Sequence, residues 1–344
     1  MKNINIPELS IIMPFFNNKE LVGEMIDSIL ANNYKDWELL AIDDGSSENT
    51  LEYLEKKYRD KRIRFIKRSI PPKGAQTCRN IGMSKMRGKY VVFFDSDDYI
   101  TKSCLRTRVE SIKQNHKLDF MVFPSAVYIN NKFDPNAEKF IYGYEINHDD
   151  IKAFARRELP FIVWSNIYRS DSLISHNIKW DTNLLSLQDA DFNMQAILSG
   201  MRYGYAKVSA DYGYRISYSS ESLSKKICSE AHHKSNIYAT EKFFQMLQAK
   251  YGHKYDRAVY QGLLNLYNYI FSDKISHNTA IEMVKCVRRY NRMFGYILKI
   301  QVLSTFFLEK IISAKRARQL PMFFYLYNHH KREKRLRKKI NPIK

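Results

Sequence analysis

The sequence has 344 residues, of which 44% are hydrophobic and 27% are charged. This composition is typical of a folded globular protein of about two domains, and the low content of Gly (12) and Pro (9) excludes a fibrous or largely disordered chain. The net charge of +20 favours anionic partners such as phosphorylated ligands, phospholipid headgroups or nucleic acid.

Short apolar segments alternate with amphipathic segments over the first hundred residues. The apolar segments predict strands, and the spacing of apolar residues between them predicts helices. A Gly at position 88 is expected to cap the third helix in a left-handed conformation. The alternation predicts an α/β fold with a mostly parallel sheet flanked by helices. The expected strands are 9–16, 37–42, 63–66 and 90–94, and the expected helices are 19–31, 50–58 and 75–86.

The remainder of the chain changes character twice. Residues 101–228 are mixed, whereas the chain from about residue 229 to 344 is helical and ends in a polybasic tail. We therefore expect an α/β domain over 1–228, whose two halves meet near residue 100, and a helical C-terminal region over 229–344. The expected strands are 119–129 and 203–209, and the expected helices are 149–158, 187–199, 232–251, 255–272, 278–292 and 296–318.

Acidic residues follow two of the predicted strands. Asp43 and Asp44 come after 37–42, and Asp95, Asp97 and Asp98 come after 90–94. Parallel strands place their carboxyl ends at one edge of a sheet, where ligands bind. Carboxylates so close together do not all stay ionised without a partner. An isolated Asp-x-Asp is more often a surface turn, but the apolar strand before it and the second acidic strand end favour a site for Mg²⁺ or Mn²⁺ with a diphosphate.

Four segments in this order resemble the family-2 glycosyltransferases with the GT-A fold. They are Ser10–Asn17, Ala41–Ser47, Gly74–Gly82 and Asp95–Asp98. The resemblance is specific over residues 9–100 and extends more weakly to about residue 225. It implies a GT-A catalytic domain over 1–228 with a Rossmann-like sheet, in which residues 1–100 bind a nucleotide sugar and residues 101–228 bind the acceptor.

The resemblance also implies roles for individual residues on the nucleotide-sugar side. An aromatic ring can stack on a pyrimidine, and a carboxylate can accept from a base N–H or a ribose hydroxyl. Lys73 and Arg79 are candidates for contact with the diphosphate, and the alternatives are a solvated Lys and an Arg on the helix surface. The other candidates are Pro14 and Phe16 beside the base, Asp43 and Asp44 at the base or ribose, Asp95 and Ser96 at the ribose, and Asp97 at the metal.

An inverting sugar transfer needs a carboxylate that removes the proton of the acceptor hydroxyl. Related enzymes supply it from an acidic pair about 90 residues after the Asp-x-Asp segment, where this chain has Gln188-Asp189 instead of Glu-Asp. Asp189 is therefore the first candidate for the base and Asp191 the second. The alternative for either residue is an N-terminal helix acid favoured by the helix dipole.

Weaker signals lie on the acceptor side. Trp164 is expected either to stack on an acceptor sugar or to pack in the core, and Arg215 is a candidate for binding a phosphate of donor or acceptor. Residues 212–224 resemble a strand-and-lid segment of the family. The pair His232-His233 could supply a metal ligand, but a solvated pair on a helix surface is the preferred interpretation.

The C-terminal residues suggest a further partner. Residues 310–344 contain twelve Lys or Arg and a single acid, next to apolar and aromatic segments. This combination suits binding to an anionic membrane, and the alternative is core helices with a solvated tail. The absence of a leader-like N-terminus or a long apolar stretch, together with four scattered cysteines, predicts a cytoplasmic protein that could be peripheral on the inner face of the cell membrane.

The sequence thus predicts an inverting, metal-assisted glycosyltransferase that moves a sugar from a UDP-sugar to a hydroxyl of a glycan or lipid-linked acceptor. One alternative is a sugar-1-phosphate nucleotidyltransferase, but residues 11–23 contain only Gly23 where that class has a Gly-rich loop. The other is a nucleic-acid-binding protein. The basic excess lies in the tail and the predicted cleft is acidic, so we expect no nucleic acid partner.

Overall fold

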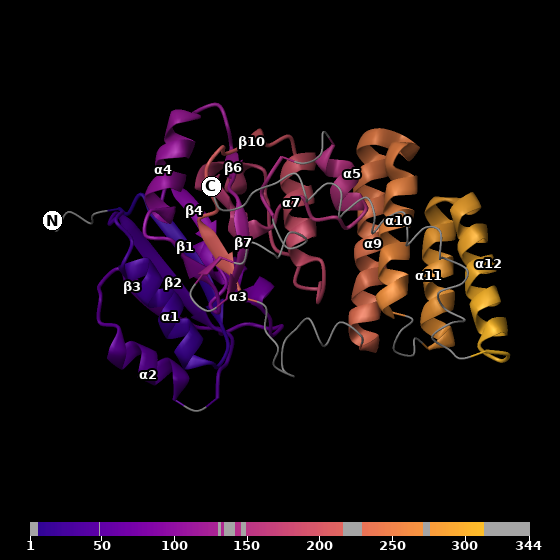
Figure 1. Ribbon diagram of the computed structural model, residues 1–344, viewed down its shortest axis with the longest axis horizontal. Coiled ribbons are helices and arrows are strands. Elements are labelled where there is room, and N and C mark those ends of the chain that lie inside the picture. Colours follow the sequence, from indigo (N-terminus) through magenta and orange to yellow (C-terminus); the bar gives the residue numbers. More distant parts are fainter. Residues whose placement is uncertain are drawn as a thin grey trace.

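The computed structural model describes residues 6–47, 49–129, 132–133, 142–145, 149–215, 229–270 and 276–312. These residues form a sheet domain followed by a row of helices (Figure 1). The lid part of the expected strand-and-lid segment, residues 220–224, and the basic tail from 313 onward lie outside the described residues.

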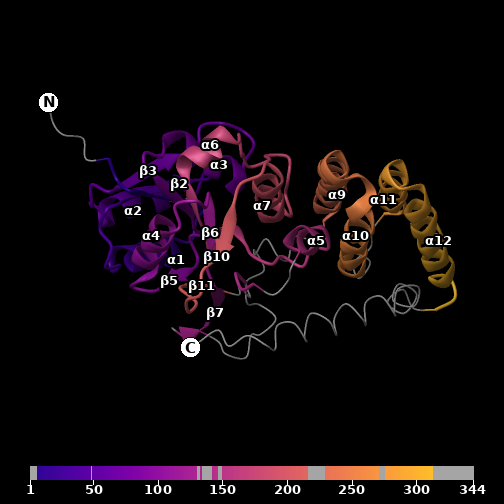
Figure 2. The same cartoon turned by 90° about the horizontal axis from the view of Figure 1, so that it is seen from above.

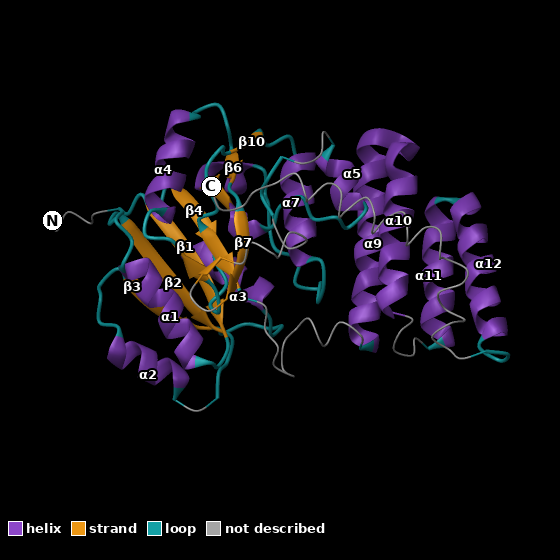
Figure 3. Cartoon of the chain, in the orientation of Figure 1, coloured by secondary structure: helices purple, strands orange, loops and turns teal. Residues whose placement is uncertain are grey.

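The main sheet has seven strands in the order β10-β6-β9-β4-β1-β2-β3. Neighbouring strands are parallel except β9, which runs antiparallel between β4 and β6. The sheet confirms the predicted α/β class, and Figure 3 shows its strands beside the flanking helices. The strands are β1 Leu9–Phe15, β2 Trp37–Asp43, β3 Ile63–Lys67, β4 Tyr90–Phe93, β6 Phe120–Val122, β9 Asn166–Arg169 and β10 Tyr203–Tyr205.

Helices cover both faces of this sheet because successive strand residues point to opposite sides. Ile11 and Met13 belong to one hydrophobic cluster with α1 and α4, whereas Ile12 belongs to another with α3 and α7. The helices of this domain are α1 Lys19–Leu30, α2 Thr50–Lys57, α3 Ala75–Lys85, α4 Cys104–Gln114, α5 Asp150–Ala155, α6 Ser170–Ser175 and α7 Gln188–Leu198.

A second sheet of four short strands lies beside the main one, in the order β5-β11-β7-β8. The segment 119–129, expected as one strand, is two strands in different sheets, and the break falls at Phe123 and Pro124. Pro124 has no N–H for a strand ladder, which favours the break. The strands are β5 Tyr99–Ile100, β7 Ser125–Ile129, β8 Lys132–Phe133 and β11 Tyr212–Tyr214, and the 3₁₀ turn η2 spans Val163–Ser165.

Gly88 does not cap α3 in a left-handed conformation, so that prediction is wrong. The helix ends at Lys85, Met86 is extended, and Gly88 has no positive φ. A Cβ atom at Gly88 would lie 2.5 Å from the backbone nitrogen of Ser10. A glycine is needed here because the chain passes directly against β1.

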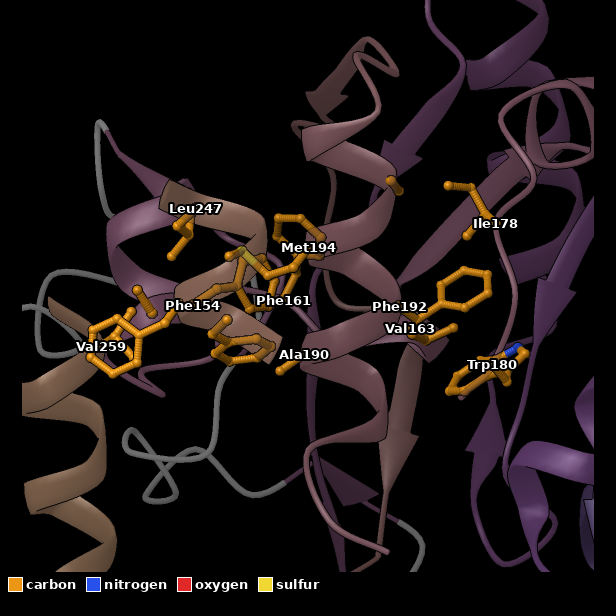
Figure 4. Packing of buried hydrophobic residues seen from close by; sticks show 14 of the residues in the cluster. Phe154, Phe161, Val163, Ile178, Trp180, Ala190, Phe192, Met194, Leu247 and Val259 are labelled. Atoms are coloured by element: carbon orange, nitrogen blue, oxygen red, sulfur yellow. The ribbon is translucent and has the colours of Figure 1, made fainter. Parts of the chain in front are cut away.

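The C-terminal helices stand side by side and extend away from the sheet (Figures 1 and 2). One hydrophobic cluster joins them to the sheet domain, since Leu247 and Val259 pack in the same core as Phe154, Phe161 and Met194 (Figure 4). Among the described residues, no helix is both long and apolar enough to cross a membrane. The helices are α9 Glu230–Tyr251, α10 Asp256–Ile270, α11 His277–Tyr290 and α12 Arg292–Leu308, with the 3₁₀ turn η3 Gly252–Tyr255 after α9.

Candidate active site

The carboxyl ends of β1, β2 and β4 lie next to each other, because these strands are parallel neighbours. The backbone N–H of Asp44 donates to the Phe15 carbonyl at 2.9 Å, and the N–H of Phe94 donates to the Ile12 carbonyl at 3.0 Å. The two acidic strand ends therefore meet at one edge of the sheet, as their positions in the sequence predict.

An aromatic ring and a lysine meet at the end of β1. The Phe16 side chain is 45% exposed, and the Lys73 ammonium lies 3.4 Å from the centre of its ring. Pro14 lies within the buried strand just before it. The predicted base-binding aromatic and the predicted diphosphate-binding lysine are thus brought together at an accessible position.

Asp43 and Asp44 shape the loops around this edge. The Asp43 Oδ1 accepts from the backbone N–H of Ser46 at 2.9 Å, and also from the Ser46 hydroxyl. The Asp44 Oδ1 accepts from Arg68 Nε at 2.6 Å and from the backbone N–H of Gly74 at 3.0 Å, at the start of α3. Arg68 is thus the counterion of Asp44, and it lies outside the sequence segments that predicted the site.

The acidic loop after β4 is held in place by Tyr212 from β11. The Tyr212 hydroxyl donates to Asp98 Oδ2 at 2.6 Å and accepts from the backbone N–H of Asp95 at 3.1 Å. The backbone N–H of Arg215 donates to Asp98 Oδ1 at 2.8 Å. Burial and the neighbouring Asp97 raise the pKa of Asp98 well above its usual value. Asp98 therefore fixes the loop to the second sheet.

Asp97 has no ion pair within the described parts of the chain, whereas Asp44 and Asp95 pair with Arg68 and Arg79. Burial, with a contribution from the charge of Asp95, raises the pKa of Asp97 to about 6. Half-buried Ser96 lies between the two acids. No group of three His, Cys, Asp or Glu suited to a metal occurs in the described residues. The loop fits a cation held by one or two carboxylates and completed by phosphate oxygens.

Arg79 connects the acidic loop to the candidate base. It is only 6% exposed, its Nη2 donates to Asp95 Oδ1 at 2.6 Å, and its guanidinium lies 4.4 Å from the centre of the Trp180 ring. Burial opposes the charge, but the carboxylates of Asp95 and Asp189 raise the pKa of Arg79 overall. The alternative of an Arg on the helix surface is therefore wrong.

The two candidate bases in the first turn of α7 have different surroundings. Burial raises the pKa of Asp189 to about 6 although the charge of Arg79 opposes this, and Asp189 Oδ1 is buried without a hydrogen-bond partner. Asp191 is 1% exposed, and its two carboxylate oxygens lie 2.8 and 2.9 Å from Lys242 Nζ. Gln195 also donates to Asp191 at 2.7 Å. Asp191 therefore has an ion pair, whereas Asp189 has none among the described residues, although burial raises the pKa of both carboxyls.

Helix α9 supports this part of the site from behind. Lys242 also contacts Asp181 at 2.8 Å, and the Tyr238 hydroxyl donates to the same carboxylate at 3.0 Å. From α3, the side-chain amide of Gln76 donates to the Leu184 carbonyl at 3.1 Å. The segment leading into α7 is thus held from both sides by residues that lack a recognisable local motif.

Trp164 and Arg215, the weaker acceptor-side candidates, both have protein partners. Trp164 stacks on Tyr212 at 5.8 Å between ring centres, and its carbonyl accepts from Arg108 at 2.6 Å. Fully buried Arg108 pairs with Asp211 through contacts of 2.6 and 2.8 Å. Arg215 forms an ion pair with Glu24 of α1.

His232 and His233 do not form a solvated pair, so the preferred interpretation is wrong. They are 7% and 1% exposed, and His232 Nδ1 lies 2.7 Å from the Ser186 hydroxyl. Burial lowers the pKa of His233, whose ring nitrogens have no hydrogen-bond partner. Helix α9 packs between α7 and α11, so this end of it is interior rather than solvated.

Comparisons with known proteins agree with this geometry. Residues 10–176 match the sequence profile described as glycosyl transferase family 2. The matched residues run from within β1 through α6. The chain is 27% identical over 205 residues to the uncharacterized glycosyltransferase EpsJ of Bacillus subtilis, and this alignment covers 57% of this chain and 58% of EpsJ.

A second similar protein is the Escherichia coli UDP-Glc:alpha-D-GlcNAc-diphosphoundecaprenol beta-1,3-glucosyltransferase WfgD. It is 31% identical over 144 residues, which are 42% of this chain and 54% of WfgD. The chain thus matches about half the length of these two relatives. The structure of S. aureus TarS residues 1–349 with UDP-GlcNAc aligns with a TM-score of 0.66 and 18% identity, covering 92% of this chain and 91% of that TarS fragment. This likeness confirms the GT-A fold.

Proposed function

We propose that this chain is an inverting glycosyltransferase that moves a sugar from a UDP-sugar to a hydroxyl group of a glycan or lipid-linked acceptor. The observation that carries the proposal is that Asp189 has a raised pKa and no ion pair among the described residues, whereas Asp191, whose pKa is also raised, pairs with Lys242. Asp189 lies in the electrostatic range of Arg79, which pairs with Asp95 of the acidic loop. Arg79 thereby connects the candidate base to the candidate diphosphate site.

The donor nucleotide is proposed to bind where Phe16 and Lys73 meet. The exposed ring offers a stacking surface for a pyrimidine, and the ammonium lies within reach of a phosphate. Uridine is favoured as the base because WfgD is named for UDP-Glc and the TarS structure contains UDP-GlcNAc. Other contacts with the donor stay predictions: they are proposed for Pro14, Asp43 and Asp44 near the base, and for Asp95 and Ser96 near the ribose.

Asp97 is proposed to hold Mg²⁺ or Mn²⁺ together with the donor diphosphate. Such a cation stabilises the negative charge that develops on the departing nucleoside diphosphate. Burial and then the charge of Asp95 raise the pKa of Asp97, which has no ion pair among the described residues, and a bound cation would offset both effects. Arg79 is committed to Asp95, so Lys73 is the better candidate for a direct contact with the diphosphate.

Asp189 is proposed to remove the proton of the acceptor hydroxyl as the oxygen attacks the anomeric carbon. A pKa of about 6 leaves the carboxylate ionised at neutral pH and more basic than an ordinary Asp. The ion pair of Asp191 with Lys242 favours a structural role for Asp191. Asp189 is thus the single base in our proposal.

The acceptor is proposed to bind to the half of the domain over residues 101–228. Trp164 and Arg215 are retained as weak candidates, since both already have partners in the protein. WfgD is named for a diphosphoundecaprenol-linked acceptor, which agrees with a role in polysaccharide biosynthesis. With such an acceptor, we propose a cytoplasmic protein that contacts the inner face of the cell membrane.

Release of nucleoside diphosphate tests this proposal. The full chain is incubated with UDP-, GDP- and dTDP-sugars, with and without Mn²⁺. We expect release from a UDP-sugar that requires the metal and is lost in Asp189→Asn, while an exposed control substitution, Asp171→Asn, retains it. Undiminished release by Asp189→Asn refutes the assigned base. Formation of pyrophosphate from UTP and a sugar 1-phosphate would instead favour a nucleotidyltransferase.

A further inference from the structure

Helix α12 carries large apolar side chains on its solvent side. Ile300, Leu303 and Phe307 are 65%, 55% and 63% exposed. At ~100° per residue, the exposed apolar residues of this segment fall within an arc of about 120°. They therefore form one continuous stripe, which consists of Met293, Tyr296, Ile297, Ile300, Leu303 and Phe307.

The opposite side of α12 holds the helix in the protein. Gly295, Leu298, Val302 and Thr305 are buried, and α12 packs against α11. Figure 2 shows α12 as the last helix of the row, with α11 on one side only. The exposed stripe is therefore separate from the side of α12 that packs in the core, and packing against α11 does not explain its apolar residues.

Cations border one edge of the stripe. Arg292, Lys299 and Lys310 fall within roughly 20° of one another on the same helical projection, next to Leu303. Between Arg292 and Leu308 the helix contains no Asp or Glu. On this side a hollow of about 430 Å³ between α11 and α12 is lined by Lys285, Arg288, Arg289, Arg292 and Tyr296.

We infer that this surface of α11 and α12 docks the protein on an anionic phospholipid membrane. The apolar stripe would enter the boundary between headgroups and acyl chains, and the cations beside it would contact lipid phosphates. A second copy of the chain fits less well, because α12 offers no acid between Arg292 and Leu308 to pair with those cations. The inference rests on the membrane contact in the proposed function and assigns it to residues separate from the basic tail.

Vesicle co-sedimentation of the full chain tests the inference. Vesicles of phosphatidylcholine alone are compared with vesicles that also contain phosphatidylglycerol. We expect binding only to the anionic vesicles, because each basic residue near such a surface favours binding by about a factor of five. Arg288→Glu/Arg292→Glu should weaken binding at least roughly 30-fold, and Ile300→Glu/Phe307→Glu should reduce it to the level of neutral vesicles.

Matched controls keep the basic tail and change exposed residues elsewhere. Lys117→Glu/Lys207→Glu removes two exposed cations of the sheet domain, and Ile174→Glu changes an apolar side chain that is 65% exposed on α6. These variants should bind like the wild type, and all variants should release nucleotide from a soluble donor at the wild-type rate. Unchanged binding by both α11–α12 variants would overturn the inference, as would a wild-type dimer that Ile300→Glu/Phe307→Glu converts to a monomer.

Discussion

Replacing the proposed base should stabilise the protein while it abolishes transfer. The pKa of Asp189 is raised from its usual value of 3.8 to about 6, chiefly by burial. A raised pKa means that the folded protein prefers the protonated carboxyl, so ionisation at neutral pH opposes folding. In Asp189→Asn the side chain keeps nearly the same shape without a charge that needs hydration.

The size of the effect follows from the pKa. Each tenfold change in the acid dissociation constant corresponds to about 1.4 kcal/mol. The change from 3.8 to about 6 thus gives about 3 kcal/mol as the upper limit of the gain in free energy of unfolding at neutral pH. Loss of the favourable charge interaction with Arg79 is already included in that pKa, because the Arg79 charge lowers it.

The pH dependence of stability is a second test of whether Asp189→Asn stabilises the protein. Below 3.8 the carboxyl is protonated in both the folded and the unfolded state, so the two proteins should be equally stable there. As the pH rises from 3.8 through about 6, Asp189 ionises more readily in the unfolded state, so the free energy of unfolding of the wild type should fall relative to that of Asp189→Asn. Above that range the difference in free energy of unfolding between the two proteins should stay constant. Urea unfolding at a series of pH values measures the difference.

Activity should move in the opposite direction. Removal of a general base typically costs about 10²- to 10⁴-fold in rate, and the wild-type rate should fall with acid through about pH 6 as Asp189 is protonated. The exposed Asp171→Asn serves as the control for an ordinary Asp substitution. A variant that is less stable than the wild type at neutral pH, or one that still transfers at more than about a tenth of the wild-type rate, refutes the reasoning.

Substitutions at three further positions test other parts of the structure. Asp97→Asn should abolish most of the stimulation by Mn²⁺ in titrations of nucleotide release, since its charge is not balanced by an ion pair in the described chain; an unchanged metal requirement would contradict the metal site. Lys242→Met should lower the free energy of unfolding by about 1–3 kcal/mol and reduce kcat more than the donor KM, because Asp191 and Asp181 lose their shared cation. Lys242→Arg should recover part of both, and a donor KM effect alone would argue against positioning of α7. Gly88→Ala should cost about 1–3 kcal/mol in urea unfolding, since its Cβ would lie 2.5 Å from a backbone atom of β1; wild-type stability would show that the chain relaxes there.

The sheet edge could be predicted because its chemistry is local in sequence. Asp44 follows β2 directly and Asp97 lies in the short loop after β4, so the α/β alternation alone places them at one edge of the sheet. The first turn of α7 was also predictable, since the segment around Asp189 keeps the helical spacing of apolar residues. The structure then separates Asp189 from Asp191 by the partner that each carboxylate has.

The partners themselves could not be predicted, because they come from distant parts of the chain. Tyr212 binds Asp98 across 114 positions, and Arg108 pairs with Asp211 across 103. Neither contact has a local pattern, and each depends on how the second sheet meets the first. The antiparallel strand β9, which enters between β4 and β6, depends in the same way on the three-dimensional fold.

The histidine pair shows why polar residues in a helix can be misinterpreted. Polar side chains at the start of α9 suggested exposure, but the helix packs between α7 and α11. Its buried residues include Ser235, Asn236 and Thr240 as well as His232 and His233. Many of these side chains form hydrogen bonds inside the protein, such as Asn236 Nδ2 to the His232 carbonyl at 2.9 Å. The hydropathy of a residue does not show whether its polar group will form a hydrogen bond inside the protein, so buried polar residues are mistaken for exposed ones.

The continuous core between the sheet domain and α9 has a consequence for dissecting this protein. A fragment that ends before α9 would lose Lys242 and leave Asp191 as an unpaired buried carboxylate two residues from the proposed base. It would also uncover the face of Met194 and Phe154 that Leu247 and its neighbours now cover. We therefore expect α9 to fold cooperatively with the sheet domain, and an active fragment to need at least the residues through Tyr251.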